Sequence, residues 1–282
     1  MARLRGTESK LLRTRLLTAA IAIPALWLII AFVPPWRPPW GAALFVGFIL
    51  AVTAAGLHEY FAMALPEHKS ERAVGVMWGI VVAAGVASRR PEFWGAGLAL
   101  GLISGLGLAL RHGADLGGAV QRLGLALLGV LYLGFFTPHV VLLRAGGYGW
   151  QWVVFTVFGA MGSDSGGYFA GRAVGRHKLA PAISPSKTFE GAVGAVAGAM
   201  LVAWLSRMLF FPALGAREAP ALGGVISLLA QLGDLAESAL KRAFGAKDSG
   251  WIIPGHGGIL DRLDSILFPV VFIYYYAAFP RA

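Results

Sequence analysis

The stretch GAALFVGFILAVTAAGLHEYFAMA, residues 41–64, decides the fold class. It is apolar and long enough to cross the hydrocarbon core of a bilayer as a helix, which needs about 20 residues. The chain therefore has at least one segment suited to lipid. Eight further apolar segments flank it, near residues 16–34, 73–88, 94–110, 123–143, 150–171, 189–211, 221–240 and 262–280.

These segments predict an all-α, polytopic integral membrane protein with about nine transmembrane helices. Basic residues precede the run that starts at Leu16, as in a signal peptide, but the run continues to Pro34 and more spans follow, so we expect a retained first helix. The segments at 73–88 and 94–110 are slightly short for a full crossing, so either is tilted, extended or re-entrant. The helix count is open by one or two.

Composition agrees with a membrane protein. Hydrophobic residues make up 57% of the chain and charged residues 13%, whereas a soluble domain carries about a quarter charged residues. The 39 glycines fit close helix packing in lipid, where small residues let backbones approach one another. The net charge of +10 could indicate nucleic acid, but basic residues beside apolar spans more often reflect topology and anionic lipids. We therefore expect membrane lipids as partners and no nucleic acid.

The distribution of basic residues predicts the orientation. With the N-terminus inside, sixteen Lys and Arg residues lie on the cytoplasmic side and seven on the opposite side, while Arg262 lies at a helix start. This asymmetry favours an N-in, C-out topology. The longest polar connections, residues 172–188 and 241–260, then share the cytoplasmic face. We divide the chain into N-terminal transmembrane helices, residues 1–150, and C-terminal helices that carry the catalytic site, residues 151–282.

Acidic residues gather in the C-terminal third, although only fourteen occur in the chain. An ionisable residue in an apolar span is costly, so it indicates a functional site unless it forms a structural ion pair. Asp261 and Asp264 lie one turn apart at a helix start, where the helix dipole favours anions. Because the chain has no cysteine, a metal would have oxygen or imidazole ligands, and oxygen ligands suit Mg²⁺.

Two helices carry polar stripes at three- and four-residue spacing. On the helix near 221–243 the stripe consists of Gln231, Asp234, Ser238 and Lys241. On the helix near 150–171 it consists of Asp164, Tyr168 and Arg172, which leads into a basic loop. A helix-end arginine that only reaches toward the interface is the alternative for Arg172.

That loop, GRAVGRHKLAPAISPSKTFEG (171–191), combines cations with hydroxyls, as a phosphate-rich ligand requires. Its candidate phosphate-binding residues are Arg172, Arg176, Ser184, Ser186, Lys187 and Thr188. The alternative is a loop that is positive only because it is cytoplasmic. The final residues lead straight into an apolar helix, whose N-terminus would favour a phosphate.

A second loop, KRAFGAKDSGWIIPGHGGILDRLD (241–264), is rich in glycine, which lets backbone amides approach an anion. His256 is either a general acid or base or a loop residue bonded to the backbone, and we rank the carboxylates above it.

The segment from Ser238 to Asp264, SALKRAFGAKDSGWIIPGHGGILDRLD, resembles the signature of the phosphatidate cytidylyltransferase (CDP-diglyceride synthase) family. Asp164 to Gly191 is similar to a second block of that family, and QLGDLAES (231–238) extends the match. One departure is Ser165, where the family commonly has threonine.

The resemblance implies transfer of a cytidylyl group from CTP to phosphatidate with Mg²⁺, at an active site facing the cytoplasm in the cell (inner) membrane. It implies a homodimer only weakly. The metal ligands would be Asp164, Asp234, Asp261 and Asp264, which is enough carboxylate for a second cation. Catalysis would rest on Asp234, Asp261, Asp264, Lys241 and Lys247. The remaining substrate-binding candidates are Ser238, Arg242, Asp248, His256 and Arg262.

Two other functions also fit parts of the pattern. A CDP-alcohol phosphotransferase would be polytopic and metal-dependent, but the D-G-x-x-A-R motif followed by paired aspartates does not occur in the sequence. An ion-coupled transporter would explain the intramembrane carboxylates, yet it would not need two basic loops on one side.

Overall fold

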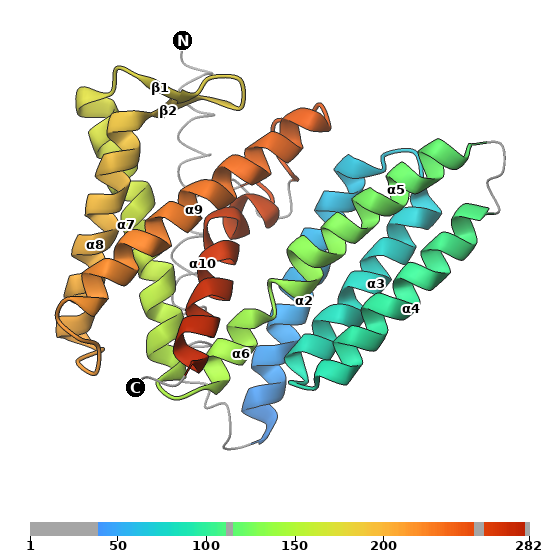
Figure 1. Cartoon of the computed structure of the whole chain (residues 1–282), viewed down its shortest axis with the longest axis horizontal. Helices are drawn as coiled ribbons and strands as arrows, with labels where there is room; N and C mark the ends of the chain where they lie inside the picture. Colours follow the sequence, from blue (N-terminus) through green and yellow to red (C-terminus); the bar gives the residue numbers. More distant parts are fainter. Residues whose placement is uncertain (1–38, 111–114, 251–256, 280–282) are drawn as a thin grey trace, which may run out of the picture. The chain divides into compact units, whose positions relative to one another are not determined.

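The computed structural model describes residues 39–110, 115–250 and 257–279 (Figure 1). The predicted first span, 16–34, and His256 lie outside these residues. The chain divides into two compact units. Unit 1 comprises residues 1–141 and 248–261, and unit 2 comprises residues 142–247 and 262–282. The division of the chain at residue 150, which we made from the sequence, remains a prediction.

Unit 1 is built from helices that pack along their neighbours in the chain. Its elements are α2 (Pro39–Ala64), α3 (Lys69–Ala87), α4 (Pro91–Leu110), α5 (Leu116–Gly129), the π-helical segment η2 (Val130–Phe135) and the start of α6 (His139–Ala145). The core forms where α2 packs on α3 and η2, with Leu57, Tyr60 and Phe61 completely buried. Gly134 of η2 lies against the backbone of Gly79 of α3, so a larger side chain there would push the two helices apart.

Unit 2 contains a helical layer and one small hairpin. Its elements are α7 (Gly149–Val174), β1 (Lys178–Ala180), β2 (Ser184–Thr188), α8 (Phe189–Leu209), α9 (Glu218–Ala243) and most of α10 (Leu260–Ala278). The strands pair antiparallel, with Lys178 opposite Thr188 and Ala180 opposite Ser184. The hairpin lies at the end of α7 and α8 (Figure 1). The loop predicted for residues 172–188 is thus partly ordered as a hairpin.

Glycines allow α7 and α8 to pack almost backbone to backbone. A Cβ atom on Gly166 or Gly198 would come under 3.0 Å from the carbonyl oxygen of Gly194 or Gly162 on the facing helix. In lipid, where apolar burial alone gives little drive for association, such close contact is a main source of helix pairing. The glycine-rich composition therefore has a direct structural role in unit 2.

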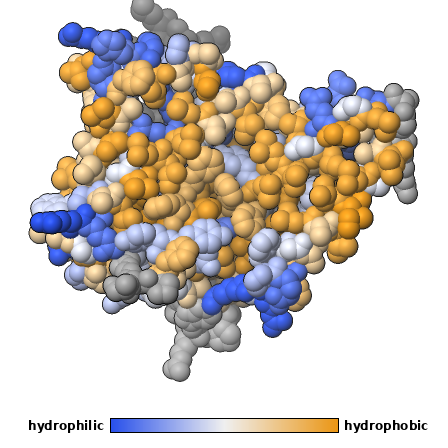
Figure 2. All heavy atoms as spheres, viewed as in Figure 1, coloured by the Kyte–Doolittle hydropathy of each residue, from blue (hydrophilic) through white to orange (hydrophobic). Residues whose placement is uncertain are grey.

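Six helical segments of the described ranges are long and apolar enough to cross a membrane. They are Ala42–Ala64, Lys69–Ala87, Pro91–Leu110, Leu116–Ala145, Phe189–Leu209 and Glu218–Ala243. Hydrophobic residues cover the lengths of the helices, whereas hydrophilic residues gather at helix ends and around the hairpin (Figure 2). The prediction of an all-α, polytopic membrane protein is confirmed. The predicted spans at 150–171 and 262–280 are helices α7 and α10, which are not among these six.

Candidate active site

A cavity of about 410 Å³ in unit 2 is lined by α7, α8, α9 and the hairpin. Six of the residues predicted to form the site line it: Asp164, Arg172, Ser186, Lys187, Thr188 and Asp234. The sequence places these residues on three separate segments, and the fold brings them to one cavity. Small residues such as Gly167, Gly171 and Ala195 complete the wall and keep the space open.

Helix α7 presents its predicted polar stripe to this cavity. Asp164, Tyr168 and Arg172 all line it, as their four-residue spacing predicts. Arg172 Nη1 donates a hydrogen bond of 2.8 Å to the Tyr168 hydroxyl. Because the phenol is neutral, this bond orients the guanidinium without cancelling its positive charge.

An ion pair between Lys187 of β2 and Asp234 of α9 joins the hairpin to the helix. The side chains are 22% and 33% exposed, so the pair is open to a ligand entering the cavity. The Ser238 hydroxyl donates a bond of 3.5 Å to Asp234 Oδ1 from the next turn of α9. The stripe on α9 thus supplies a carboxylate and a hydroxyl, and β2 supplies the cation that pairs with the carboxylate.

A third carboxylate, Asp264, approaches Asp234 because α9 and α10 cross closely. A Cβ atom on Gly233 would collide with the backbone carbonyl of Asp264. Asp264 repels both Asp234 and Asp164 electrostatically. Asp234 and Asp264 are half-buried and Asp164 is exposed, and three carboxylates that repel one another in this way favour the binding of a cation.

Lys241 forms a 2.6 Å ion pair with Glu237, whose side chain is completely buried. Lys241 also attracts Asp264 electrostatically. The position of this lysine is therefore set by a buried acid one turn earlier on α9. Glu237 is not among the predicted site residues, because its own spacing places it beside the stripe.

Side chains of α8 and α9 hold the hairpin in place. Glu190 accepts hydrogen bonds from the backbone N–H groups of Arg176 and His177, and its Oε1 lies 2.6 Å from His177 Nδ1. Arg242 Nε donates a 3.4 Å bond to the Ile183 carbonyl. The Thr188 hydroxyl accepts from the Gly191 N–H and caps α8. The cap fixes Thr188 next to Lys187.

Sequence reasoning did not predict a polar network that joins α7 and α9 at the cavity wall. Ser163 Oγ and Ser227 Oγ are 2.8 Å apart, and Gln231 Nε2 donates to Ser227 Oγ at 3.0 Å. Ser163 and Gln231 also line the cavity. No local pattern marks Ser163 and Ser227 as partners, because they lie on different helices.

The other predicted residues lie apart from the cavity wall. Arg262 attracts the Asp164 carboxylate electrostatically. Ser184 is the first residue of β2. Lys247 is exposed at the end of unit 2. Asp248 and Asp261 belong to unit 1, where Asp261 Oδ2 accepts from the Ser249 and Gly258 N–H groups at 3.3 and 3.0 Å.

The donor atoms in unit 2 are chemically suited to Mg²⁺. Asp164, Asp234 and Asp264 offer carboxylate oxygens, and Mg²⁺ takes one or two protein carboxylates and completes its shell with water and phosphate. Among residues 39–110, 115–250 and 257–279, no group of three or more acidic or histidine side chains has the spacing of a ready-made metal site. Two or three carboxylates of this kind would leave the rest of the coordination shell to water and phosphate oxygens.

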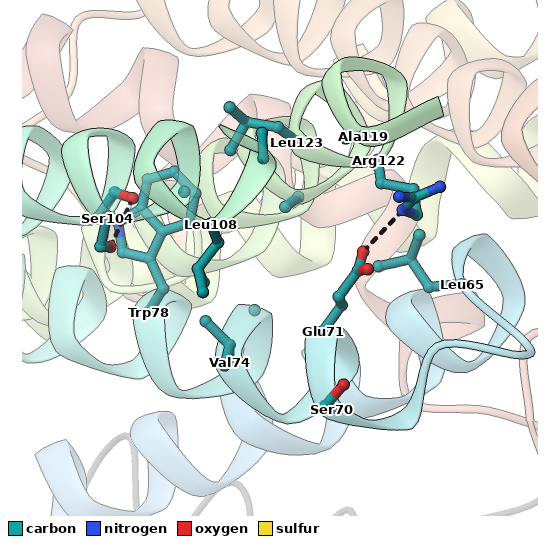
Figure 3. A pocket seen from close by; sticks show the side chains of 15 residues that line it. Leu65, Ser70, Glu71, Val74, Trp78, Ser104, Leu108, Ala119, Arg122 and Leu123 are labelled. Atoms are coloured by element: carbon teal, nitrogen blue, oxygen red, sulfur yellow. Dashed lines mark hydrogen bonds and ion pairs between the residues drawn. The ribbon is translucent and has the colours of Figure 1, made fainter. Parts of the chain in front are cut away.

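Unit 1 has a cavity of its own, about 240 Å³, lined by α3, α4 and α5 (Figure 3). Trp78, Val74, Leu108 and Leu123 form apolar walls, and Glu71 faces Arg122 at one end (Figure 3). Arg122 pairs with Glu71 and with Asp115, both at 3.1 Å. This cavity contains none of the predicted site residues.

Comparison with known proteins identifies relatives over almost the whole chain. A model of the "Cytidylyltransferase family" matches residues 13–279. A phosphatidate cytidylyltransferase of Brucella suis is 35% identical over 274 residues, which is 95% of this chain and 93% of the relative. Its counterpart in Bacillus subtilis is 38% identical over 159 residues, or 56% of this chain and 59% of the relative. The protein from Staphylococcus epidermidis is 41% identical over 142 residues, which is 50% of this chain and 54% of the relative.

Proposed function

The chain belongs to the cytidylyltransferase family, and on that basis we propose that it transfers a cytidylyl group from CTP to phosphatidate. The products are CDP-diacylglycerol and pyrophosphate, and the reaction belongs to phospholipid biosynthesis. The observation that carries the proposal is the polar cavity of unit 2, where cations, hydroxyls and carboxylates line a space among apolar helices. A reaction between a lipid phosphate and a nucleoside triphosphate needs apolar surroundings for the lipid and charged or hydroxyl groups for the phosphates.

In the proposed reaction, an oxygen of the phosphatidate phosphate attacks the α-phosphorus of CTP in line. A P–O bond forms to the lipid phosphate, and the bond between the α-phosphorus and the bridging oxygen breaks, so that the electron pair leaves with pyrophosphate. The second pKa of a phosphate monoester lies near 6, so the nucleophile is largely ionised at neutral pH. The chain therefore needs no strong general base, and positioning and charge stabilisation dominate.

The basic residues bind and orient phosphates in this scheme. Lys187 and Arg172 face the cavity and are the main candidates, with Ser186 and Thr188 as hydrogen-bond donors. Lys241 and Arg242 at the end of α9 and Lys247 beyond it are proposed to bind phosphates as well. The further binding candidates are Arg176, Ser184, Ser238, Asp248, His256 and Arg262. The division of these residues between CTP and lipid is part of the proposal.

Mg²⁺ is the proposed cofactor, and Asp164, Asp234, Asp261 and Asp264 are its proposed ligands, with room for a second cation. When bound, the ion would neutralise charge on the triphosphate and polarise the scissile bond. The mutual repulsion of Asp164, Asp234 and Asp264 supports this assignment, because a cation relieves it. The Lys187–Asp234 pair would open as substrate binds, which frees the lysine for phosphate and the carboxylate for metal.

We further propose nine transmembrane helices in an N-in, C-out topology, in the inner membrane, with the active site facing the cytoplasm and the chain acting as a homodimer. The excess of basic residues on the predicted inner side supports the orientation. The absence of native cysteine makes the test simple. Cysteine replacing the exposed Ala182 should react with an impermeant thiol reagent only from the cytoplasm, and cysteine replacing the exposed Ala216 only from outside. The reverse labelling pattern would contradict the active-site orientation.

The function is tested with protein purified in detergent and supplied with phosphatidate, Mg²⁺ and CTP labelled in the cytidine. We expect labelled, lipid-soluble product that requires both substrates and a divalent ion. Absence of such product from folded protein, across a series of divalent ions, would refute the proposed activity.

A further inference from the structure

Among the acidic residues of unit 1 that the structure describes, Glu59 has the most deeply buried side chain, at 3% exposure. It lies on α2 within the candidate membrane span Ala42–Ala64, between the buried residues Leu57 and Phe61. A carboxylate in such a segment costs several kcal/mol unless polar partners compensate it. Sequence reasoning did not single out this residue, and it lies outside both cavities.

The partners of Glu59 come from the segment that precedes α10. Glu59 Oε2 accepts a 2.9 Å hydrogen bond from the N–H of Leu260, the first residue of α10. It also accepts a 3.3 Å bond from the Ser249 hydroxyl. The N–H groups of a first helical turn have no partner within the helix, and the helix dipole favours an anion there. Glu59 therefore acts as a cap that α2 supplies to α10.

The contact between Glu59 and this segment leaves no room for a side chain at the two neighbouring glycines. A Cβ atom on Gly250 or on Gly258 would come under 3.0 Å from a carboxylate oxygen of Glu59. Because Glu59 is buried and held by two hydrogen bonds, it has little room to move aside. Part of the glycine-rich pattern in residues 241–264 is thus explained by close approach to Glu59.

Ser249 links Glu59 to Asp261. Its hydroxyl donates to Glu59, and its backbone N–H donates to Asp261 Oδ2 at 3.3 Å. Asp261 Oδ2 also accepts from the Gly258 N–H at 3.0 Å. Two carboxylates that lie far apart in the sequence, Glu59 and Asp261, thus both bond to Ser249 and to the backbone of residues 258–260.

We propose that Glu59 is a positioning residue that holds Asp261 and the first turn of α10 in the geometry needed for catalysis. It binds no substrate itself and acts through Ser249 and Leu260. The inference rests on the proposed function, because it takes Asp261 to be a ligand of the catalytic cation. Its structural part, the ordering of Ser249 and of residues 258–261 by Glu59, can be tested without substrate or metal.

The test compares three variants with the wild type in detergent. Glu59→Gln keeps the shape and one acceptor but removes the charge, and Ser249→Ala removes only the hydroxyl link. The matched control is Thr53→Val, since Thr53 is also completely buried on α2 and its hydroxyl bonds only within the helix, to the Ile49 carbonyl at 2.8 Å. If Glu59→Gln does not fold, Ser249→Ala carries the test.

The first measurement is the rate of tryptic cleavage after Lys247, which is exposed and adjoins the segment, without substrate or metal. Cleavage tracks the population of locally opened protein. We expect cleavage about tenfold faster in Glu59→Gln, a smaller increase in Ser249→Ala, and the wild-type rate in Thr53→Val. Wild-type cleavage rates in both test variants would overturn the proposal.

The second measurement is turnover as a function of Mg²⁺. We expect kcat to fall about tenfold in Glu59→Gln and the half-saturating Mg²⁺ concentration to rise, as for other residues that orient metal ligands. A merely structural role would lower the amount of active protein and leave the half-saturating Mg²⁺ concentration unchanged, and that result would overturn the positioning role. Faster cleavage in Glu59→Gln, together with a wild type that forms no product, would support the ordering of the segment and refute the proposed function instead.

Discussion

The cavities of the two units contain similar kinds of charged residues in opposite arrangements. In unit 1 the cation Arg122 lies 3.1 Å from each of two carboxylates, Glu71 and Asp115, while the remaining walls are mostly apolar. In unit 2 Arg172 bonds to a neutral phenol, and Lys187 forms an ion pair with only one carboxylate, Asp234. An arginine between two carboxylates has little charge left for a phosphate, whereas an arginine on a phenol keeps its charge. Charge arrangement, more than the presence of a cavity, thus marks the site.

The largest expected effect comes from Asp234→Asn in the cavity of unit 2. The substitution keeps the shape but removes the negative charge from the centre of the three carboxylates. We expect turnover to fall on the order of 10³-fold, as when one electrostatic group is removed from a catalytic site. The assay is labelled CDP-diacylglycerol formed per mole of protein, with folding checked by size-exclusion chromatography. Near-normal turnover would remove Asp234 from the mechanism.

Lys187→Ala tests the cationic side of the same cavity. It deletes the partner of Asp234 and a proposed phosphate ligand, and a hydrogen bond between charged groups contributes roughly 1.5–3 kcal/mol. We expect KM for CTP to rise about ten- to a hundredfold, which initial rates over a CTP series would measure. A KM equal to that of the wild type would place the triphosphate elsewhere.

The closely packed α7–α8 pair is tested by Gly166→Ala. The added methyl group would collide with the Gly194 carbonyl and move the wall that carries Asp164. Overpacking of this kind costs roughly 1–3 kcal/mol. We expect a lower melting temperature in detergent and, in parallel, lower activity. Gly107→Ala is the matched control, because a Cβ atom there has no neighbour within 4 Å.

The smallest effect is expected in the cavity of unit 1. Glu71→Gln removes the charge of one of the two acids that pair with Arg122 but keeps a hydrogen-bond acceptor, and Arg122 keeps its 3.1 Å pair with Asp115, so we expect a loss of about 1 kcal/mol. We expect unchanged kcat and KM, and a shift in melting temperature of a few degrees at most. Loss of turnover comparable to that of Asp234→Asn would contradict the distinction between the two cavities.

The sequence predicted the helices and the polar stripes correctly because both depend on local spacing. Apolar length located α2, α3, α4, α8 and α9, and four-residue spacing placed Asp164 and Arg172 on one face of α7. The hairpin at 178–188 was not predicted, because its strands are short and polar and have no apolar alternation.

Contacts between distant segments could not be predicted from spacing. The Lys187–Asp234 pair, the Ser163–Ser227 bond and the Glu59–Leu260 bond each join residues on different elements. A lone Glu59 in an apolar run gives one usable signal, since a buried carboxylate needs a partner. That signal indicates that a partner exists but does not identify it.

Binding of substrate in the cavity of unit 2 can be measured through substrate protection of two engineered cysteines. Ser186 lines that cavity and Ser70 lines the cavity of unit 1, and both are exposed, so each can be replaced by cysteine in a chain that has none. We predict that CTP with Mg²⁺ slows thiol labelling of Ser186→Cys several-fold and leaves labelling of Ser70→Cys unchanged. Unchanged labelling of Ser186→Cys, with or without protection at residue 70, would show that the substrate does not occupy the cavity of unit 2.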